Sequence, residues 1–597
     1  MCGIVGYLGK KPAVPILLSG LKRLEYRGYD SAGICVAEKQ ALKIFKKEGP
    51  IKNLEADLNQ QTINSQIGIA HTRWATHGQP NKINAHPHYD CQHQIAVVHN
   101  GIIENFEVLK ILLEKEGHKI ISETDSEIIA HLIEKFYHDD LEKAVLEAVK
   151  LLEGTFGLAV MAAGEHKIVA ARRGSPLILG LGQDEVFVAS DASAIIEYTK
   201  QVIYLEDNEI AVISDSGYEV KSLDGHDINN QVTEIQWTIA EIEKGGFEYF
   251  MLKEIFEQPK TIANALRGRI KDGKIKLSVN FDPQKVDKII ITACGTSWHS
   301  ALIGKYLLEK IAGIPTEVDY ASEFRYRNPI VRPNNLLIVI SQSGETADTL
   351  AALRETKDCE TLGIINSVGS TIAREVKSGI YLHAGPEIGV ASTKAFTSQV
   401  ASLIMLALYL KEKISGDGDD KLSAELLAIP EKIQAILNQA EVIKEISQNF
   451  VSAKNLLYLG RGINFPVALE GALKLKEVSY IHAEGYPAAE MKHGPIALID
   501  KNMFVVFIVN HGPIFEKIIS NMQEVRARGG RIIAITDTKD AVIEKLSEFI
   551  ITVPSVSEEL SPLINIIPLQ LMSYYVAHAN GINVDKPRNL AKSVTVE

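Results

Sequence analysis

Residues 288–313, KIIITACGTSWHSALIGKYLLEKIAG, decide the fold class of the second half of the chain. A short apolar run ends at a glycine turn, and a helical pattern follows it. Residues 335–353 (NLLIVISQSGETADTLAAL) and 360–376 (ETLGIINSVGSTIAREV) repeat this plan. Strands that are apolar on both faces and alternate with helices predict a parallel, doubly wound α/β sheet.

The same plan returns later in the chain, which indicates an internal repeat. Its second copy covers NLLYLGRGINFPVALEGALKLKE (455–477), MFVVFIVNHGPIFEKI (503–518) and RIIAITDTKDAVIEKL (531–546). We therefore predict two α/β subdomains, at residues 287–425 and 446–582, and only the first keeps a hydroxyl-rich turn. Residues 583–597 form a tail, and the simplest interpretation of such an end is a frayed, solvated terminus.

The first 215 residues have a different pattern. Short β-rich runs such as GIVGYL, IGIAHT, QIAVVHNG and GLAVMAA end at Gly, Asn or Asp, and residues 123–136 (ETDSEIIAHLIEKF) have helical periodicity. Strands and helices in separate runs predict a layered α+β domain over residues 2–215. Residues 216–286 then connect the two halves and contain a helix-like stretch, GFEYFMLKEIFEQPKTIANAL.

Composition narrows the classes of protein. A chain of 597 residues is too long to fold around a single hydrophobic core, so several domains are expected. A net charge of -12 without long charge blocks argues against nucleic-acid binding. Five cysteines without a C-x-x-C pair argue against a disulfide framework or a structural zinc site, and fit a reducing compartment. We found neither a membrane-spanning apolar run nor a signal peptide, so we expect a soluble cytoplasmic protein that binds no membrane.

Cys2 is a candidate nucleophile. Its small side chain permits removal of Met1, which leaves Cys2 with a free α-amine. The pKa of such an amine, about 7.7–8.0, lets it act as general base for its own thiol. A buried cysteine that merely starts a strand is the structural alternative.

Other residues supply what an acyl-transfer site needs. Asn100 and Gly101 offer a side-chain NH2 and an unobstructed backbone N–H for an oxyanion. Arg73 suits a carboxylate, and Asp125 suits an ammonium group. Each has a structural alternative: a hairpin turn, a surface ion pair or a helix charge. Together they suit an α-amino acid that carries a side-chain amide.

The motifs CGIVGY, YRGYDSAG (26–33), HTRWATHGQP (71–80), HNGIIENF (99–106) and ETDSE (123–127) extend over about the first 215 residues. This part of the chain resembles the class II, N-terminal-nucleophile glutamine amidotransferases. The resemblance implies an αββα glutaminase domain with Cys2 as nucleophile and with Asn100 and Gly101 as oxyanion hole. It implies that glutamine is held by Arg73, Thr76, His77 and Asp125, with Trp74 near the ammonia exit.

Two loops in the second half favour a phosphate ligand. Residues 341–346 (SQSGET) and 294–297 (CGTS) each follow an apolar strand and open a helix. Hydroxyls and backbone N–H groups at a helix N-terminus suit phosphate, although a capping serine would explain either loop alone. Two such loops at strand ends of one sheet favour ligand binding in the crevice there.

This half resembles a tandem pair of sugar isomerase (SIS) domains. The domain order, with the tail PRNLAKSVTVE, resembles a family of glutamine-dependent, isomerising sugar-phosphate aminotransferases of amino sugar biosynthesis. That resemblance implies fructose 6-phosphate and glutamine as substrates, glucosamine 6-phosphate and glutamate as products, internal ammonia transfer, and no metal, nucleotide or redox cofactor. The implied sugar-phosphate residues are Thr296, Ser297, Ser341, Gln342, Ser343, Thr346, Val390, Ala391, Ser392 and Lys474.

Glu470, Lys474 and Glu477 are spaced to share one helix face, which by itself could be a surface ion-pair ladder. The resemblance implies Glu477 as the base that moves a proton between C1 and C2. It also implies His493 as the ring-opening residue, supplied across a homodimer interface. Lys592 would form a Schiff base with the open sugar, which makes the tail a lid; its pKa must then be lowered, and Arg588 is a candidate neighbour.

Two alternatives stay open at this point. The glutaminase could serve another acceptor, such as a phosphoribosyl pyrophosphate or an aspartyl adenylate, but the loops those acceptors need were not found. The SIS pair could instead be a non-catalytic sugar-phosphate sensor, although a sensor has no need of Glu477, His493 or Lys592.

Overall fold

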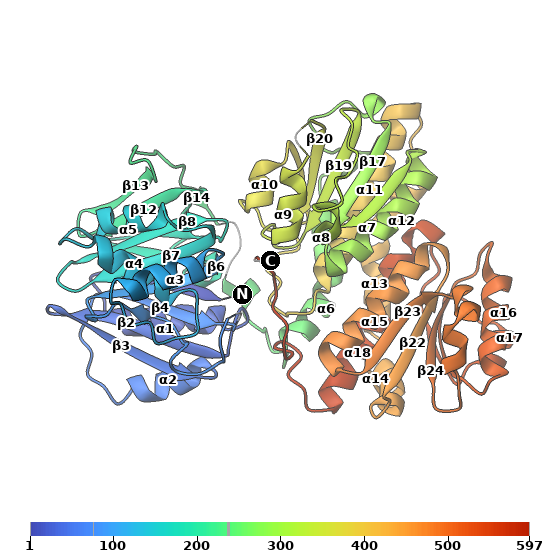
Figure 1. The fold of residues 1–597 in the computed structure, drawn as a ribbon. Helices are drawn as coiled ribbons and strands as arrows, with labels where there is room; N and C mark the ends of the chain where they lie inside the picture. Colours follow the sequence, from blue (N-terminus) through green and yellow to red (C-terminus); the bar gives the residue numbers. More distant parts are fainter. Residues whose placement is uncertain (1, 76, 236–238, 357, 596–597) are drawn as a thin grey trace. The chain divides into compact units, whose positions relative to one another are not determined.

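The computed structural model describes the chain except residues 1, 76, 236–238, 357 and 596–597 (Figure 1). It divides into two compact units, one made of Met1–Glu243 with Ala591–Glu597 and one of Lys244–Leu590.

The first unit contains two antiparallel sheets. In spatial order, the eight-stranded sheet consists of β14 (Thr233–Glu234), β11 (Gln201–Tyr204), β9 (Ile178–Gly182), β10 (Glu185–Ala189), β1 (Gly3–Gly9), β4 (Ile67–Arg73), β2 (Ser31–Glu38) and β3 (Ala41–Glu48). The six-stranded sheet consists of β13 (Gly217–Ser222), β12 (Glu209–Ser214), β8 (Lys167–Arg173), β7 (Gly154–Ala162), β6 (Ile95–Ile103) and β5 (His88–Tyr89).

Side-chain alternation along the strands stacks these sheets. Ile4 and Leu8 of β1 share a core with Ala96 and Val98 of β6. The other face of β6 packs against helices α3 (Phe106–Lys115), α4 (Glu127–Phe136) and α5 (Leu141–Val149). Helices α1 (Ala13–Leu24) and α2 (Ile51–Leu58) lie against strands of the eight-stranded sheet. The predicted αββα architecture is therefore confirmed.

The predicted start of the helix at residue 123 is wrong, because α4 begins at Glu127. The carboxylate of Glu127 reaches back to the backbone N–H groups of Ile121 and Ser122. The carboxylate of Asp125 accepts the backbone N–H of Ile103 at 2.9 Å. These bonds hold the preceding segment in turns, so Asp125 lies just before the helix.

The second unit contains two parallel five-stranded sheets with one topology. The first consists of β18 (Thr316–Tyr320), β17 (Lys288–Ala293), β19 (Asn335–Ser341), β20 (Glu360–Ile365) and β21 (Ser378–Tyr381). The second consists of β23 (His482–Pro487), β22 (Asn455–Gly460), β24 (Phe504–Val509), β25 (Arg531–Thr536) and β26 (Phe549–Thr552). Both have strand order 2-1-3-4-5, so their switch points lie at β17/β19 and β22/β24. The predicted parallel sheets and internal repeat are confirmed.

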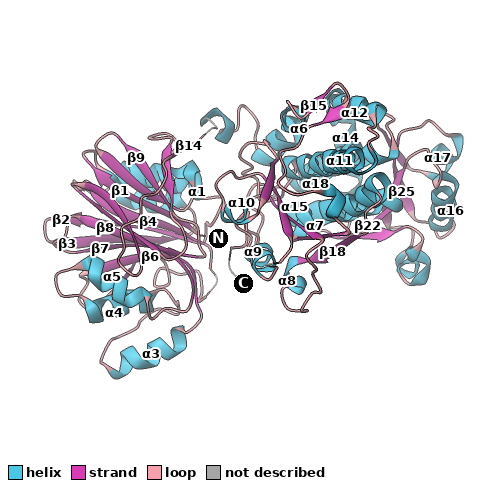
Figure 2. Ribbon diagram, turned by 90° about the horizontal axis from the view of Figure 1, so that it is seen from above, coloured by secondary structure: helices cyan, strands magenta, loops and turns pink. Residues whose placement is uncertain are grey.

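Helices cover both faces of each sheet, as a doubly wound fold requires. Ile289 and Ile291 of β17 face a core that includes α6 (Phe250–Leu266), α7 (Gly295–Leu307) and α11 (Lys394–Ser415), whereas Ile290 faces the opposite side. The same core continues through α15 (Phe465–Ser479) and α18 (Ser561–Ala579) of the second subdomain (Figure 2). One apolar core therefore joins both subdomains.

One segment, Glu558–Ala579, is long and apolar enough to cross a membrane by length and composition alone. The window that passes this test is entirely buried inside the protein. The segment contains α18, the central helix of the shared core.

Candidate active sites

A cavity of about 410 Å³ lies in the first unit at the start of β1. Its walls come from the ends of β4 and β6, the segment before α4 and the tail of the chain. The lining residues are Cys2, Arg73, Trp74, Ala75, His77, His86, His99, Asn100, Gly101, Ile102, Thr124, Asp125, Ser126, Ser593, Val594 and Thr595.

The half-buried thiol of Cys2 faces the end of β4, because strands β1 and β4 pair with Gly3 opposite Thr72. The backbone N–H of Trp74 lies 3.3 Å from Sγ, and the Trp74 carbonyl oxygen lies 3.4 Å from it. Burial raises the pKa of the Cys2 thiol, although the Trp74 N–H and the Arg73 charge act to lower it. A thiol in this environment needs a base before it can attack.

Asn100 points its amide nitrogen toward Cys2 and donates to the Cys2 carbonyl oxygen at 3.2 Å. Nε2 of His71 lies 3.1 Å from both Asn100 Oδ1 and the His99 carbonyl oxygen. Burial lowers the pKa of His71 to about 3, so the ring is neutral. Since both partners are acceptors, we assign the proton to Nε2. His71 thus fixes which way the amide of Asn100 points.

His71 is not among the site residues predicted from the sequence, although it opens the motif HTRWATHGQP. Its role could not be found from that motif, because the contact joins strand β4 to strand β6 of the other sheet. Such pairing is set by the stacking of the sheets.

Gly101 has a φ of 138°, and a Cβ there would lie 2.0 Å from the carbonyl oxygen of Thr155 on β7. No other residue fits this position without moving the neighbouring strand. Glycine at this position therefore allows β6 to lie this close to β7 at the cavity wall.

Arg73 and Asp125 line the cavity in fixed positions. The guanidinium of Arg73 donates to the carbonyl oxygens of His77, Gly78 (3.3 Å) and Gln79 (3.2 Å). Burial lowers the pKa of Arg73, and acidic neighbours including Asp125 oppose this shift. A cation and a carboxylate in one cavity suit the two charged groups of an α-amino acid. His77 and Trp74 line the same cavity, whereas Thr76 lies outside the described residues.

The motif YRGYDSAG supports the loop after β4. The carboxylate of Asp30 accepts the Ala75 backbone N–H at 2.8 Å, and Arg27 forms an ion pair with Asp191. A Cβ at Gly28 would lie 2.7 Å from backbone atoms of Arg73 and Trp74. Because position 28 is a glycine, the motif can pack directly against the loop that contacts Cys2.

The tail contributes Ser593, Val594 and Thr595 to the cavity, and Lys592 directly precedes them in the same unit. Arg588 belongs to the second unit, where its backbone N–H donates to the Tyr480 hydroxyl at 2.7 Å. The roles of Lys592 and Arg588 toward a sugar remain predictions.

The two hydroxyl-rich loops of the second unit lie at the first switch point, after β17 and after β19. Ser341 Oγ accepts the Gly344 backbone N–H at 2.9 Å and lies 3.0 Å from the Thr346 hydroxyl. Ser343 Oγ accepts the Glu345 N–H at 3.1 Å. Gln342 lies between them in the same turn, which is therefore already shaped at the opening of α9 (Ala347–Arg354).

The other loop is anchored from two sides. Ser297 Oγ accepts the side-chain amide of Gln399 at 2.9 Å. The Thr296 hydroxyl donates to Glu470 at 3.0 Å and accepts from Lys474 Nζ at 3.0 Å. Helix α15 of the second subdomain thus completes a site on the first.

Glu470, Lys474 and Glu477 meet on one face of α15. Nζ of Lys474 lies 3.3 Å from Glu470 and 2.6 Å from Glu477, and the lysine is fully buried. Burial acts to lower the pKa of Lys474, but both carboxylates outweigh it and raise that pKa. This arrangement is a buried charged cluster, unlike the solvent-exposed ladder considered from the sequence.

The remaining predicted residues lie in two other places. Val390 and Ala391 are buried before α11, and the Ser392 hydroxyl donates to Glu387 at 2.9 Å. His493 is exposed on the turn Glu490–His493 of the second subdomain.

The second switch point differs in chemistry. Asn565 donates through its side chain to Asn464 at 2.9 Å and to Asn510 at 2.7 Å. Amides that bond to one another take the place of the hydroxyl-rich turns, as the repeat comparison predicted.

Comparisons with known proteins agree with this architecture. Residues 40–251 match the glutamine amidotransferase domain family, and residues 284–409 and 449–579 match the SIS domain family. The chain is 54% identical to the glutamine–fructose-6-phosphate aminotransferase (isomerizing) of Chlorobaculum tepidum, 51% to that of Bacteroides thetaiotaomicron and 47% to that of Thermus thermophilus. Each match covers 100% of both chains.

A solved structure also resembles the second unit. It is the C-terminal domain of glucosamine-fructose-6-phosphate aminotransferase from Francisella tularensis, at 41% identity and a TM-score of 0.55. The match covers 58% of this chain and 100% of that one.

Proposed function

The chain belongs to the family of glutamine–fructose-6-phosphate aminotransferases (isomerizing), and on that premise we propose that it converts fructose 6-phosphate and glutamine into glucosamine 6-phosphate and glutamate. One observation carries the proposal: the Cys2 thiol shares a cavity with Asn100, Arg73 and Asp125. This set suits an amino acid with a side-chain amide. Full-length relatives of this name favour fructose 6-phosphate as the acceptor over a phosphoribosyl pyrophosphate or an aspartyl adenylate. They also favour an enzyme over a sugar-phosphate sensor.

In the glutaminase reaction, removal of Met1 frees the α-amine of Cys2, which takes the thiol proton. The thiolate attacks the glutamine amide carbon, and the oxyanion accepts hydrogen bonds from the Asn100 side chain and the Gly101 N–H. The ammonium formed at Cys2 returns its proton to the leaving nitrogen, which departs as ammonia. Water then hydrolyses the γ-glutamyl thioester to glutamate.

Substrate orientation follows from the charges around Cys2. Arg73 binds the α-carboxylate of glutamine and Asp125 binds its ammonium group, with His77 and Thr76 as further contacts. Trp74 lines the same cavity as the Cys2 thiol, and its proposed place is at the exit of the departing ammonia. Ammonia must pass internally to the sugar, because free ammonia at neutral pH is mostly protonated.

In the sugar reaction, the loops at residues 294–297 and 341–346 hold the phosphate, with residues 390–392 at the sugar. Lys592 forms a Schiff base at C2 of the open sugar with loss of water, and ammonia then displaces the lysine amine and leaves the sugar imine. Glu477 then moves a proton between C1 and C2. Lys474, 2.6 Å from Glu477, holds that carboxylate in position.

We further propose a homodimer in which His493 opens the sugar ring of the partner subunit. The exposure of His493 in a single chain supports this, since a residue given to a neighbour must be accessible. The five free thiols favour a reducing cytoplasm, with the product entering amino sugar biosynthesis.

The Cys2→Ala variant tests the two-site proposal. We expect glutamine-dependent synthesis of glucosamine 6-phosphate to vanish, while isomerisation of fructose 6-phosphate without glutamine persists at the wild-type rate. Each activity would be measured on the same preparation. Loss of both activities in a folded variant would contradict two separate sites.

A further inference from the structure

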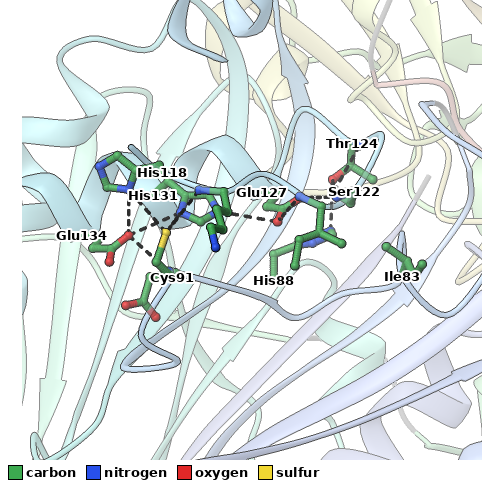
Figure 3. A network of polar contacts seen from close by, with 12 residues as sticks. Ile83, His88, Cys91, His118, Ser122, Thr124, Glu127, His131 and Glu134 are labelled. Carbon is green, nitrogen blue, oxygen red and sulfur yellow. Dashed lines mark hydrogen bonds and ion pairs between the residues drawn. The ribbon is translucent and has the colours of Figure 1, made fainter. Parts of the chain in front are cut away.

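Four side chains of the first unit converge outside the cavity described above (Figure 3). We call them the Cys–His–His–Glu cluster; its members are Cys91, His118, His131 and Glu134. One potential ligand atom from each lies within 4.8 Å of all the others. Cys91 follows β5, His118 follows α3, and the last two lie one turn apart on α4.

The distances between these atoms are short. Sγ of Cys91 lies 3.8 Å from His118 Nδ1 and 3.5 Å from His131 Nδ1. Oε2 of Glu134 lies 2.9 Å from His118 Nδ1 and 3.4 Å from His131 Nδ1. Ligands about 2.0–2.3 Å from a tetrahedral zinc ion are roughly 3.3–3.6 Å apart. The cluster thus needs only small side-chain adjustments to surround one ion.

We propose that the Cys–His–His–Glu cluster binds one divalent cation of the zinc class. Thiolate, imidazole and carboxylate are the ligands that zinc takes in proteins. With neutral histidines, the thiolate and the carboxylate supply two negative charges for the ion. Binding releases the Cys91 proton to solvent. The exposed position of Cys91 gives the ion a way in, while His131 is buried.

Neighbouring groups orient the ligands as metal sites require. Nε2 of His131 lies 3.5 Å from a carboxylate oxygen of Glu127, so Nδ1 faces the other three ligands. A carboxylate on the second nitrogen is the usual partner of a metal-bound histidine. The Lys119 backbone N–H donates to Cys91 Sγ at 3.4 Å, which favours a thiolate. An ordinary histidine–glutamate ion-pair network has no need of a thiol at its centre.

The site ties the end of β5 and the α3–α4 connection to α4. Glu127, which orients His131, also holds the backbone of Ile121 and Ser122. The Ser122 hydroxyl lies 2.9 Å from the Thr124 hydroxyl, which in turn lies 3.1 Å from Nε2 of His88 (Figure 3). Thr124 also lines the cavity beside Asp125. The bound ion would therefore brace the segment that carries Asp125. This consequence rests on the proposed function, whereas metal binding itself does not.

The sequence argued against a structural zinc site because no C-x-x-C pair is present. That criterion misses this cluster, whose only cysteine is Cys91 and whose other ligands come from three later positions. The fold brings them together by packing α4 against the six-stranded sheet.

The test uses tag-free, full-length protein that has been stripped with a chelator. Titration with Zn²⁺, followed by metal analysis after gel filtration, should give about one ion per chain. Co²⁺ should give thiolate-to-metal charge transfer and the intense visible bands of tetrahedral coordination. Cys91→Ser should abolish both the charge-transfer band and the high-affinity binding of zinc. Glu127→Gln should lower the affinity for zinc about 10- to 100-fold.

Two control variants make the result specific. His166→Gln changes an exposed histidine of the same unit whose Nδ1 lies 2.8 Å from an Asp215 carboxylate oxygen, and this variant should bind zinc as wild type does. Cys2→Ala should do the same, which separates this site from the proposed nucleophile. Wild-type protein that retains no zinc, or Cys91→Ser that retains it unchanged, would overturn the proposal. Circular dichroism would verify that each variant is folded.

Discussion

Gly101→Ala is the substitution that tests the geometry of the glutaminase site most sharply. The new methyl group would stand 2.0 Å from the Thr155 carbonyl oxygen and 2.7 Å from the Thr155 carbonyl carbon. Both are backbone atoms of β7, so no side-chain rotation relieves the clash. Strand β6 must move, and with it the two proposed oxyanion donors, Asn100 and Gly101. Loss of one such donor costs about 10²–10³-fold in kcat.

The assay is glutamine hydrolysis, with fructose 6-phosphate isomerisation measured in parallel. We expect the hydrolysis kcat of Gly101→Ala to fall by about 10²–10³-fold while isomerisation is unchanged. Gly164→Ala is the matched control, because Gly164 also has a positive φ (82°) but has no atom within 4 Å of its Cβ position. It should lose only about 1–2 kcal/mol of stability and keep its activity. A Gly101→Ala enzyme with near wild-type hydrolysis would refute the reasoning.

Three further predictions address other parts of the sites. Because the folded pKa of His71 (about 3) lies below its ordinary value of 6.5, its contribution to stability is lost as pH falls from about 6.5 toward 3. Between about pH 7 and pH 5, urea denaturation should show wild type losing about 2 kcal/mol more than His71→Gln; equal losses would contradict a neutral His71. Lys474→Met should lower the free energy of unfolding by about 3–5 kcal/mol, because the fully buried Glu470 loses the Lys474 ammonium group 3.3 Å away; an unchanged urea midpoint would count against this. Ser341→Ala should raise KM for fructose 6-phosphate at least about tenfold by releasing the Gly344 N–H, whereas the exposed Ser415→Ala should not, and equal KM values would argue against a phosphate loop.

The sequence predicted most of the central strands but not the sheet edges. Strands such as β17 and β19 are continuous apolar runs, because they are buried on both faces. The edge strands β18 (TEVDY) and β23 (HAEGYP) carry charged residues and are partly exposed, so they have no such run. Their existence follows from pairing with a neighbour, which a local pattern does not encode.

The candidate site shows a similar division. Cys2, Arg73, Asn100 and Asp125 could be named from their chemistry, and the fold brings them to one cavity. The orienting role of His71 could not be named, because it depends on the side chains of His71 and Asn100 meeting between two stacked sheets. The exposed ion-pair ladder considered for α15 differs from the observed buried cluster, since helix spacing alone does not say what covers a face.

The central claim is that Cys2, freed of Met1, is the nucleophile. Purified protein would be treated with a glutamine-analogue alkylating agent and measured by intact-mass and peptide mass spectrometry. The account predicts a chain that lacks Met1 and carries one adduct, located on Cys2, with glutamine protecting against the reaction. A chain that retains Met1 yet hydrolyses glutamine, or an adduct on another cysteine, would contradict it.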